Sequence, residues 1–302
     1  MSANKNYVAN KNHKSTMFSK LFGENKENAL SLYNAVNGSN YTNADDLIFT
    51  TLDDVVYMKM KNDVSFLFDK TLSLYEHQST YNPNMPLRGF LYFADLYRQL
   101  IKDNERIYSK SIVKIPAPKY VVFYNGDKKD MPEEAKELYL SDAFDREVEP
   151  GKFEWTATMV NINAGMNPEL LERCKVLGGY ATFVDKVRTY NKSMSLTEAV
   201  DQAVDDCVEA GVLEEFFSKH RREVRNMVLT EFDEEKFLKM MRAEERAEGE
   251  RNLLIKILSD LGSVSEELQN RIRNIDDDTL VHWTKLASRA ESMQEFLEQV
   301  KE

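Results

Sequence analysis

The sequence predicts an α/β core followed by an all-helical half. Short runs rich in β-branched and aromatic residues lie before residue 165, whereas apolar residues recur at helical spacing from Pro168 onward. With 302 residues, of which 42% are hydrophobic, the chain is long enough to bury a sizeable core. We expect four parts: a disordered basic tail at 1–16, the α/β core at 17–165, a helical extension at 166–250 and a small helical region at 251–302.

The elements of the α/β core are predicted from the turn signals between its apolar runs. Asn37-Gly38 is typical of a helix C-terminus, and Asp69-Lys70-Thr71 separates two β-rich runs as in a hairpin. The predicted elements are, in order, a helical turn at 17–22, a helix at 24–36, strands at 47–52, 55–60, 64–68 and 72–78, a helix at 87–102, and strands at 120–124 and 153–162.

The second half of the chain is predicted to be helical almost throughout. Within its longest helix, Arg242–Arg251 is polar all round, which is typical of a solvent-bridging or self-associating helix. An apolar stripe between Leu253 and Leu261 needs a covering surface, either the core or a second copy, and we favour a homodimer through the C-terminal helices. The predicted helices are at 168–176, 178–190, 195–209, 213–228, 233–261, 264–274 and 276–300.

Composition excludes several classes of protein. Cys174 and Cys207 lie far apart in apolar helical surroundings, which indicates free thiols in a reducing compartment rather than a disulfide or zinc site. No stretch approaches about 18 uninterrupted apolar residues, so we expect no membrane span. The polar N-terminus lacks the apolar run of a signal peptide. We therefore expect a cytoplasmic protein.

The net charge of −11 argues against a protein that simply coats nucleic acid. Charge distribution matters more than the sum, however. The first 23 residues contain four lysines and no acid, and a second basic cluster lies at 219–225. Two interpretations stay open: an acidic surface with incidental basic spots, or local contacts with phosphates.

The hairpin places two carboxylates opposite each other. A two-residue loop at Asp69-Lys70 pairs Phe68 with Thr71, and counting outward then sets Asp63 opposite Glu76. Directly opposed side chains share one face, with Cβ atoms about 4.5–5.5 Å apart. Like charges so placed destabilise a sheet unless something bridges them, and a divalent cation is the natural bridge. The alternative is that both carboxylates are merely solvated at strand ends.

A magnesium site would suit this pair. Mg²⁺ favours carboxylate and carbonyl oxygens together with retained waters, so Asp63, Glu76 and the backbone carbonyl of His77 could supply three ligands. A metal-bound water would be the nucleophile toward a phosphodiester. Gln78 projects from the same face as Glu76, two residues farther along the strand.

These residues resemble a known catalytic signature. Asp63, twelve intervening residues and Glu76-His77-Gln78 are similar to the D…(D/E)-x-K pattern of the PD-(D/E)XK nuclease superfamily. Other segments narrow the resemblance to the Rpn family of recombination-promoting nucleases, also described as transposase-like. Those segments are 18–23, 75–78, Arg88 with Tyr92 and Tyr97, 119–126, 161–163 and 180–188.

The resemblance implies a restriction-endonuclease-like core, with a mixed central sheet flanked by helices, and a Mg²⁺-dependent DNA endonuclease of low sequence specificity, with Mn²⁺ as a substitute. Its role would be recombination, transposition or defence. Asp63 and Glu76 would bind the metal, and Glu27 on the first helix would add an acid. Gln78 replaces the usual lysine and could position a water without supplying charge. The alternative is a weakly active or inactive nuclease derivative that binds DNA or protein.

Three basic residues are weaker candidates for contacts with DNA phosphates, namely Lys20, Arg88 and Lys119. Arg88 could equally well pair with a carboxylate of the site. His77 alternates to the face opposite Glu76, so we expect its ring to pack or to lie at the surface rather than to bind metal.

Overall fold

A computed structural model of the chain describes residues 16–50, 62–101, 107–146, 148–149 and 152–300. By its internal contacts the chain divides into two units, one ending at Glu231 and the other beginning at Phe232. Of the predicted tail at 1–16, all but Thr16 lies outside the described residues, as does the predicted strand at 55–60.

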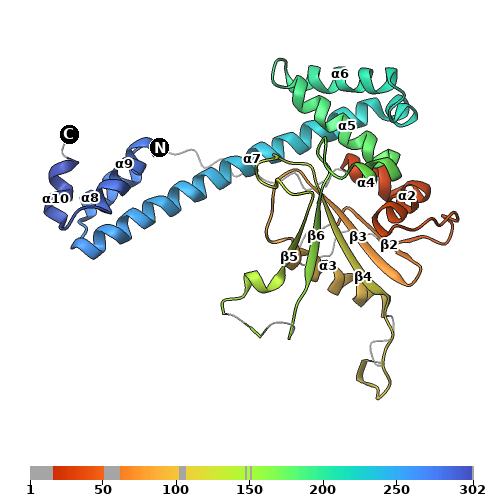
Figure 1. Cartoon of the computed structure of the whole chain (residues 1–302), viewed down its shortest axis with the longest axis horizontal. Coiled ribbons are helices and arrows are strands. Elements are labelled where there is room, and N and C mark those ends of the chain that lie inside the picture. The colour runs from red at the N-terminus through yellow and green to blue at the C-terminus, as the bar shows by residue number, and fades with distance from the viewer. Residues whose placement is uncertain (1–15, 51–61, 102–106, 147, 150–151, 301–302) are drawn as a thin grey trace. The chain divides into compact units, whose positions relative to one another are not determined.

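The first unit is built on an open, mixed sheet of six strands in the order β1-β2-β3-β4-β6-β5 (Figure 1). Pairing is parallel from β3 through β4 to β6 and antiparallel elsewhere. The α/β class predicted from the sequence is therefore confirmed. The strands are β1 (Ile48–Phe49), β2 (Val64–Phe68), β3 (Thr71–Gln78), β4 (Ala117–Tyr124), β5 (Ala135–Tyr139) and β6 (Thr156–Asn161).

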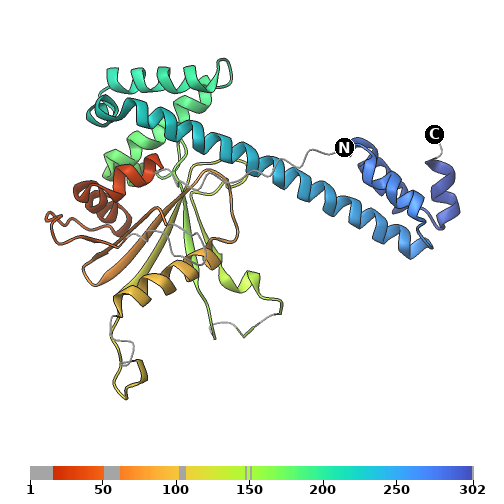
Figure 2. The ribbon, with the colours of Figure 1, turned by 180° about the vertical axis from the view of Figure 1, so that it is seen from behind.

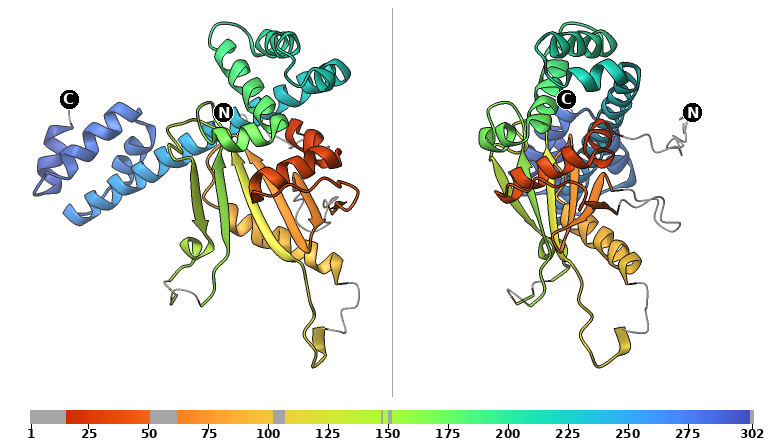
Figure 3. Two further views of the ribbon diagram at one scale, coloured as in Figure 1. Left: turned by 45° about the vertical axis from the view of Figure 1, so that its right-hand side comes forward. Right: turned by 90° about the vertical axis from the view of Figure 1, so that its right-hand side faces the viewer.

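Helices cover both faces of this sheet (Figures 2 and 3). One face packs against α3 in a cluster that includes Phe93, Tyr120 and Val122. On the other face, Phe18 of α1 meets Phe123 of β4, with ring centroids 5.6 Å apart. The helices of this unit are α1 (Met17–Gly23), α2 (Lys26–Asn37), α3 (Met85–Leu100), the short 3₁₀ helix η2 (Leu140–Ala143), α4 (Pro168–Arg173), α5 (Lys175–Tyr190), α6 (Leu196–Glu209) and the start of α7 (Glu214–Leu261).

The turn between β2 and β3 explains why the hairpin register could be predicted. Asp69 and Lys70 have φ values of 45° and 59°, and two successive positive φ angles are the mark of a type I′ two-residue turn. The strands accordingly pair from Phe68 with Thr71 to Val64 with Tyr75, as the sequence predicted.

The ends of other elements are fixed by local chemistry. Gly38 adopts a left-handed conformation with φ of 65° and its N–H donates to the Asn34 carbonyl, which ends α2 where predicted. Strand β5 was not predicted, because Ala135-Lys136-Glu137 carries no strand signal. This exposed edge segment becomes a strand by pairing with β6.

The second unit has a core of its own. Its helices are the end of α7, α8 (Glu266–Asn274), α9 (Asp277–Ala287) and α10 (Met293–Gln299). Ser292 caps α10 by accepting from the Glu295 N–H, so the single helix predicted at 276–300 is divided in two. Likewise α7 replaces the two helices predicted at 213–228 and 233–261. None of the helices in the described ranges is long and apolar enough to cross a membrane.

The apolar stripe on α7 is covered within this second unit. Leu254 and Leu258 are fully buried in a cluster with Leu280, Trp283 and Phe296. Leu253, at the start of the same stripe, is 51% exposed, so the cover within this unit is incomplete there. Self-association through these helices stays a prediction that a mass measurement by light scattering would test.

Candidate functional site

The carboxylates of Asp63 and Glu76 meet at the open end of the β2–β3 hairpin. The ladder ends at the pair Val64 and Tyr75, so Asp63 and Glu76 occupy the next step. Asp63 lies just outside β2, and its Oδ2 accepts a hydrogen bond of 2.9 Å from the His77 main-chain N–H. The structure thus brings together the two acids that the register predicted.

Glu76 is a buried acid with one satisfied oxygen. The residue is 1% exposed, and its Oε2 lies 2.9 Å from Nη2 of Arg88. Its Oε1 is buried and has no hydrogen-bond partner among the described residues. Burial raises the pKa of Glu76 to about 8, against the opposing charge of Arg88 and with the help of the negative charge on Asp63.

Arg88 is held firmly beside this acid on the first turns of α3. Its Nη2 also reaches the Tyr92 hydroxyl at 3.3 Å, and its Nη1 lies 3.5 Å from the Met85 sulfur. Burial disfavours the charge of Arg88, but the adjacent Glu76 raises the pKa of the guanidinium above its ordinary value. Of the two roles expected for Arg88, the structure shows the ion pair with a site carboxylate.

The His77 ring lies on the opposite face of the sheet from Glu76. Its Nε2 shares a hydrogen bond of 3.1 Å with the Tyr180 hydroxyl, and Phe18 stacks on it at 5.9 Å. Burial, with the positive charge of Arg188, lowers the pKa of His77 to about 3, so the ring stays neutral. Of the packed and surface positions expected for this ring, the contacts show the packed one.

Gln78 is the last residue of β3 and is half-buried. Its carbonyl accepts from the Asn125 N–H at 3.0 Å, which ties the end of β3 to the end of β4. Strand alternation puts its side chain on the same face as Glu76. That side chain makes no hydrogen bond to any residue in the described part of the chain, so its amide is available to a ligand or a water.

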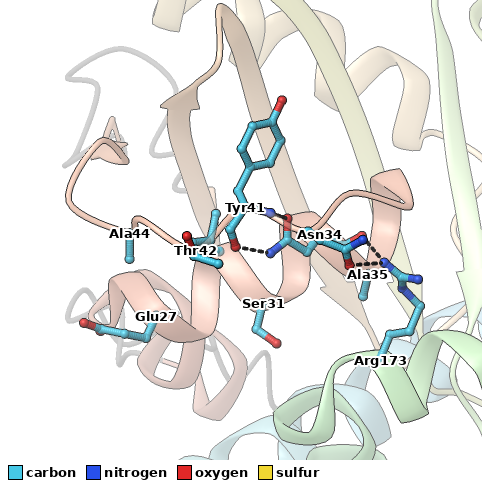
Figure 4. A pocket seen from close by; sticks show the side chains of 10 residues that line it. Glu27, Ser31, Asn34, Ala35, Tyr41, Thr42, Ala44 and Arg173 are labelled. Carbon is cyan, nitrogen blue, oxygen red and sulfur yellow. Dashed lines mark hydrogen bonds between the residues drawn. The ribbon is translucent and has the colours of Figure 1, made fainter.

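Glu27 does not join the carboxylate pair, contrary to the expectation. The face of α2 that packs on the sheet is apolar and includes Leu30, which leaves Glu27 exposed. Glu27 lines a different hollow, with Arg173 at the other end (Figure 4). Within the residues that the structure describes, no three acids, histidines or cysteines are grouped so that they could hold a metal ion.

The predicted phosphate contact of Lys20 is also not supported. Its Nζ lies 3.0 Å from Glu223 and 3.5 Å from Glu24, so its charge is already balanced by two acids. The basic cluster at 219–225 is similar, since Arg221 pairs with Asp205 at 2.6 Å. Such pairs weaken the case for these residues as a DNA-binding surface.

Lys119 lies on the wrong face of the sheet for the site. The β3–β4 register pairs it with Ser73, whereas Glu76 is paired with Val122. Because side chains alternate between faces, Lys119 projects away from the face that carries Glu76. The sequence places Lys119 just before the strand, but it does not predict the register with β3 and therefore does not predict the face on which Lys119 lies.

Three of the segments that carried the family resemblance meet at the ends of β4 and β6. Arg188 Nη1 donates to Asn125 Oδ1 at 2.9 Å and to the Gly126 carbonyl at 3.3 Å. Asn163 Nδ2 donates to the same carbonyl at 3.2 Å. Arg188 and Tyr180 were not proposed as site residues, because only the fold reveals that α5 lies against these strand ends.

Comparison of the chain with protein-family models, curated proteins and solved structures gives no significant match. The site must therefore be interpreted from its own chemistry.

Asp63 and Glu76 fit a small divalent cation. Mg²⁺ is commonly held by one or two carboxylates, with waters and substrate phosphate oxygens completing its shell. Glu76 Oε1 is a buried oxygen without a partner, and buried polar atoms of this kind call for a missing ligand or a specific role. A cation beside Asp63 would satisfy that oxygen and relieve the repulsion between the acids.

Proposed function

We propose that the chain is a divalent-metal-dependent DNA endonuclease with a core of the PD-(D/E)XK type. The observation that carries the proposal is the buried, half-satisfied Glu76 beside Asp63 at the open end of the hairpin. The order of elements supports it too, since α2 precedes the hairpin and α3 crosses to β4, which runs parallel to β3. This agrees with the mixed sheet and flanking helices that the family resemblance implies.

In this mechanism Asp63, Glu76 and the His77 carbonyl would hold Mg²⁺ or Mn²⁺. The bound ion would supply a water of lowered pKa and would offset charge on the scissile phosphate. Gln78 would orient the attacking water through its amide, but it cannot take up the proton. Arg88 balances the charge of Glu76 and, once a cation takes over that task, could donate two N–H groups to a phosphate.

The test is cleavage of supercoiled plasmid with Mg²⁺, with Mn²⁺ and with chelator. We expect metal-dependent nicking by the wild type and a loss of at least about 100-fold in Asp63→Ala and Glu76→Ala, because even outer-shell changes at metal sites cost 10–100-fold. Glu27→Ala, which changes an exposed acid away from the pair, serves as the control and should cleave normally. Equal activity in all four proteins would eliminate the proposal.

A second candidate function is binding of DNA or protein without cleavage. Two observations favour it: Arg88 already pairs with Glu76, and Gln78 stands where a lysine usually assists the water. This candidate predicts no stabilisation by Mg²⁺ or Mn²⁺, whereas an intact metal site adds about 2.7 kcal/mol at a hundredfold excess over Kd. A melting temperature unchanged by either ion, together with retained DNA binding, would favour the second candidate.

A further inference from the structure

We infer that helix α5 positions the proposed metal site from the far side of the sheet, through Tyr180 and Arg188. Both side chains fix the end of β3, which carries Glu76 and Gln78 and whose main chain orients Asp63. The inference rests on the proposed function, and it gives α5 a role in positioning the residues at the end of β3.

Asp63 lies one step beyond the end of the β2–β3 ladder. Regular pairing ends at Val64, and Asp63 precedes β2. Its carboxylate is oriented instead by the N–H of His77, at 2.9 Å from Oδ2. Groups that donate to a ligating carboxylate decide how it is presented to a metal ion. A shift of the main chain at His77 would therefore move the donor that orients Asp63 Oδ2.

The first contact from α5 fixes His77 itself. The Tyr180 hydroxyl lies 3.1 Å from His77 Nε2, and the two rings meet edge-on with centroids 5.2 Å apart. Phe18 of α1 stacks on the same imidazole at 5.9 Å. Tyr180 is 1% exposed, so its hydroxyl has little freedom to leave this position. The ring of His77 is thus held by two helices while its main-chain N–H serves Asp63.

The second contact fixes the next residue, Gln78, through one intermediary. Arg188 Nη1 donates to Asn125 Oδ1 at 2.9 Å, and the Asn125 N–H donates to the Gln78 carbonyl at 3.0 Å. Asn125 is 2% exposed and is therefore a rigid link. Tyr180 and Arg188 are eight residues apart on α5, just over two helical turns, and so both restrain the same strand end.

The test compares two tyrosine-to-phenylalanine changes on one helix. Tyr180→Phe removes the hydroxyl that contacts His77 and keeps the ring that packs against Phe18. The control is Tyr190→Phe, which removes a hydroxyl that donates to Asp206 on α6 instead of contacting β3. For each protein we would measure the melting temperature and the Mg²⁺ concentration that gives half-maximal plasmid cleavage.

We expect Tyr180→Phe to raise that Mg²⁺ concentration about tenfold, at the low end of the range for outer-shell partners of metal ligands. Tyr190→Phe, which changes a less buried residue, should lower the melting temperature by less and leave the Mg²⁺ requirement near the wild-type value. Equal Mg²⁺ requirements in the two variants would overturn the inference and leave the proposed function intact. A wild type that does not cleave would instead remove the proposed function, and the inference with it.

A double-mutant cycle tests whether Tyr180 acts through His77. His77→Phe removes the ring nitrogen that bonds to the Tyr180 hydroxyl and keeps a ring in the same place. If Tyr180 positions Asp63 by way of His77, then Tyr180→Phe should change the Mg²⁺ requirement no further in the His77→Phe background. Effects that simply multiply would show that Tyr180 contributes only packing and would overturn the inference.

Discussion

Glu76 and His77 are neighbours on β3, and alternation places them on opposite faces of the sheet with opposite electrostatic outcomes. Glu76 lies under α3 with Arg88 at 2.9 Å, and its pKa is raised to about 8. His77 lies among Phe18 and Tyr180, and its pKa is lowered to about 3. One cause acts on both, because burial favours the neutral form of each group.

Glu76 and His77 differ in how far their burial is compensated. On the α1 and α5 side, His77 is packed between aromatic rings and its Nε2 is hydrogen-bonded. On the α3 side, Glu76 keeps an unsatisfied oxygen next to a second acid, Asp63. Proteins tolerate such violations chiefly where function requires them. This difference between Glu76 and His77 is in keeping with the proposal that places the metal ligands on the α3 face.

Because the pKa values of Glu76 and His77 differ between the folded and unfolded states, the stability of the fold depends on pH. Between the ordinary pKa of 4.5 and the folded value of about 8, folded Glu76 retains a proton that the unfolded chain has lost, so stability falls as pH rises. Between pH 6.5 and about 3, His77 is protonated in the unfolded chain but stays neutral in the folded protein, so stability falls as pH falls. The two slopes oppose each other between pH 4.5 and 6.5.

The largest expected effect on stability comes from removing the positively charged side chain of Arg88 on the α3 face. Arg88→Met leaves a buried acid without its partner, which typically costs about 3–5 kcal/mol when the acid is charged. We expect that loss in the free energy of unfolding at pH above the Glu76 pKa, measured by urea denaturation, and a smaller loss in mildly acidic buffer.

Arg98→Met is the matched control for Arg88. Arg98 lies on the same helix and pairs with Asp95, but its side chain is 70% exposed. Exposed pairs contribute roughly 0–1 kcal/mol, so this variant should remain close to wild type. Equal losses in the two variants would mean that Glu76 is better solvated than its burial indicates.

The next largest effect is the contribution of Glu76 to the pH dependence of stability. Glu76→Gln keeps an acceptor for Arg88 and removes the titration, so the decline in stability between about pH 5 and 8 should disappear. At up to about 1.4 kcal/mol per pKa unit, the difference between variant and wild type should change by the order of 3 kcal/mol across that window. The control Glu137→Gln, on exposed edge strand β5, should keep the wild-type slope, and a slope retained in Glu76→Gln would refute this assignment.

The same pair of faces shows what a sequence can and cannot predict. The opposition of Asp63 and Glu76 and the outward turn of His77 followed from the two-residue loop at Asp69-Lys70, since turn geometry fixes register and register fixes faces. Local rules of this kind act over a few residues and need no tertiary information.

Local turn and register rules do not predict the contacts between the sheet and the helices that pack on it. Whether Arg88 reaches Glu76 depends on how α3 crosses the sheet, and whether Glu27 reaches it depends on the rotation of α2. The sequence left Arg88 open between two partners and placed Glu27 in the site, where the structure does not put it. The role of Tyr180 depends likewise on where α5 docks, more than 100 residues from His77.

The smallest expected effect is on stability at acid pH and concerns His77, on the face packed by α1 and α5. It tests whether the His77 ring is neutral in the folded protein. His77→Gln removes the titration and keeps a group that can bond to Tyr180, so the decline in stability below pH 6.5 should become shallower. Because His77 is half-buried and partly screened by solvent, we expect a change on the order of 1 kcal/mol, less than for Glu76. His282→Gln, on the exposed side of α9, should leave the acid limb unchanged. An acid limb that persists in His77→Gln would mean that the imidazole takes up its proton in the folded protein as readily as in the unfolded chain.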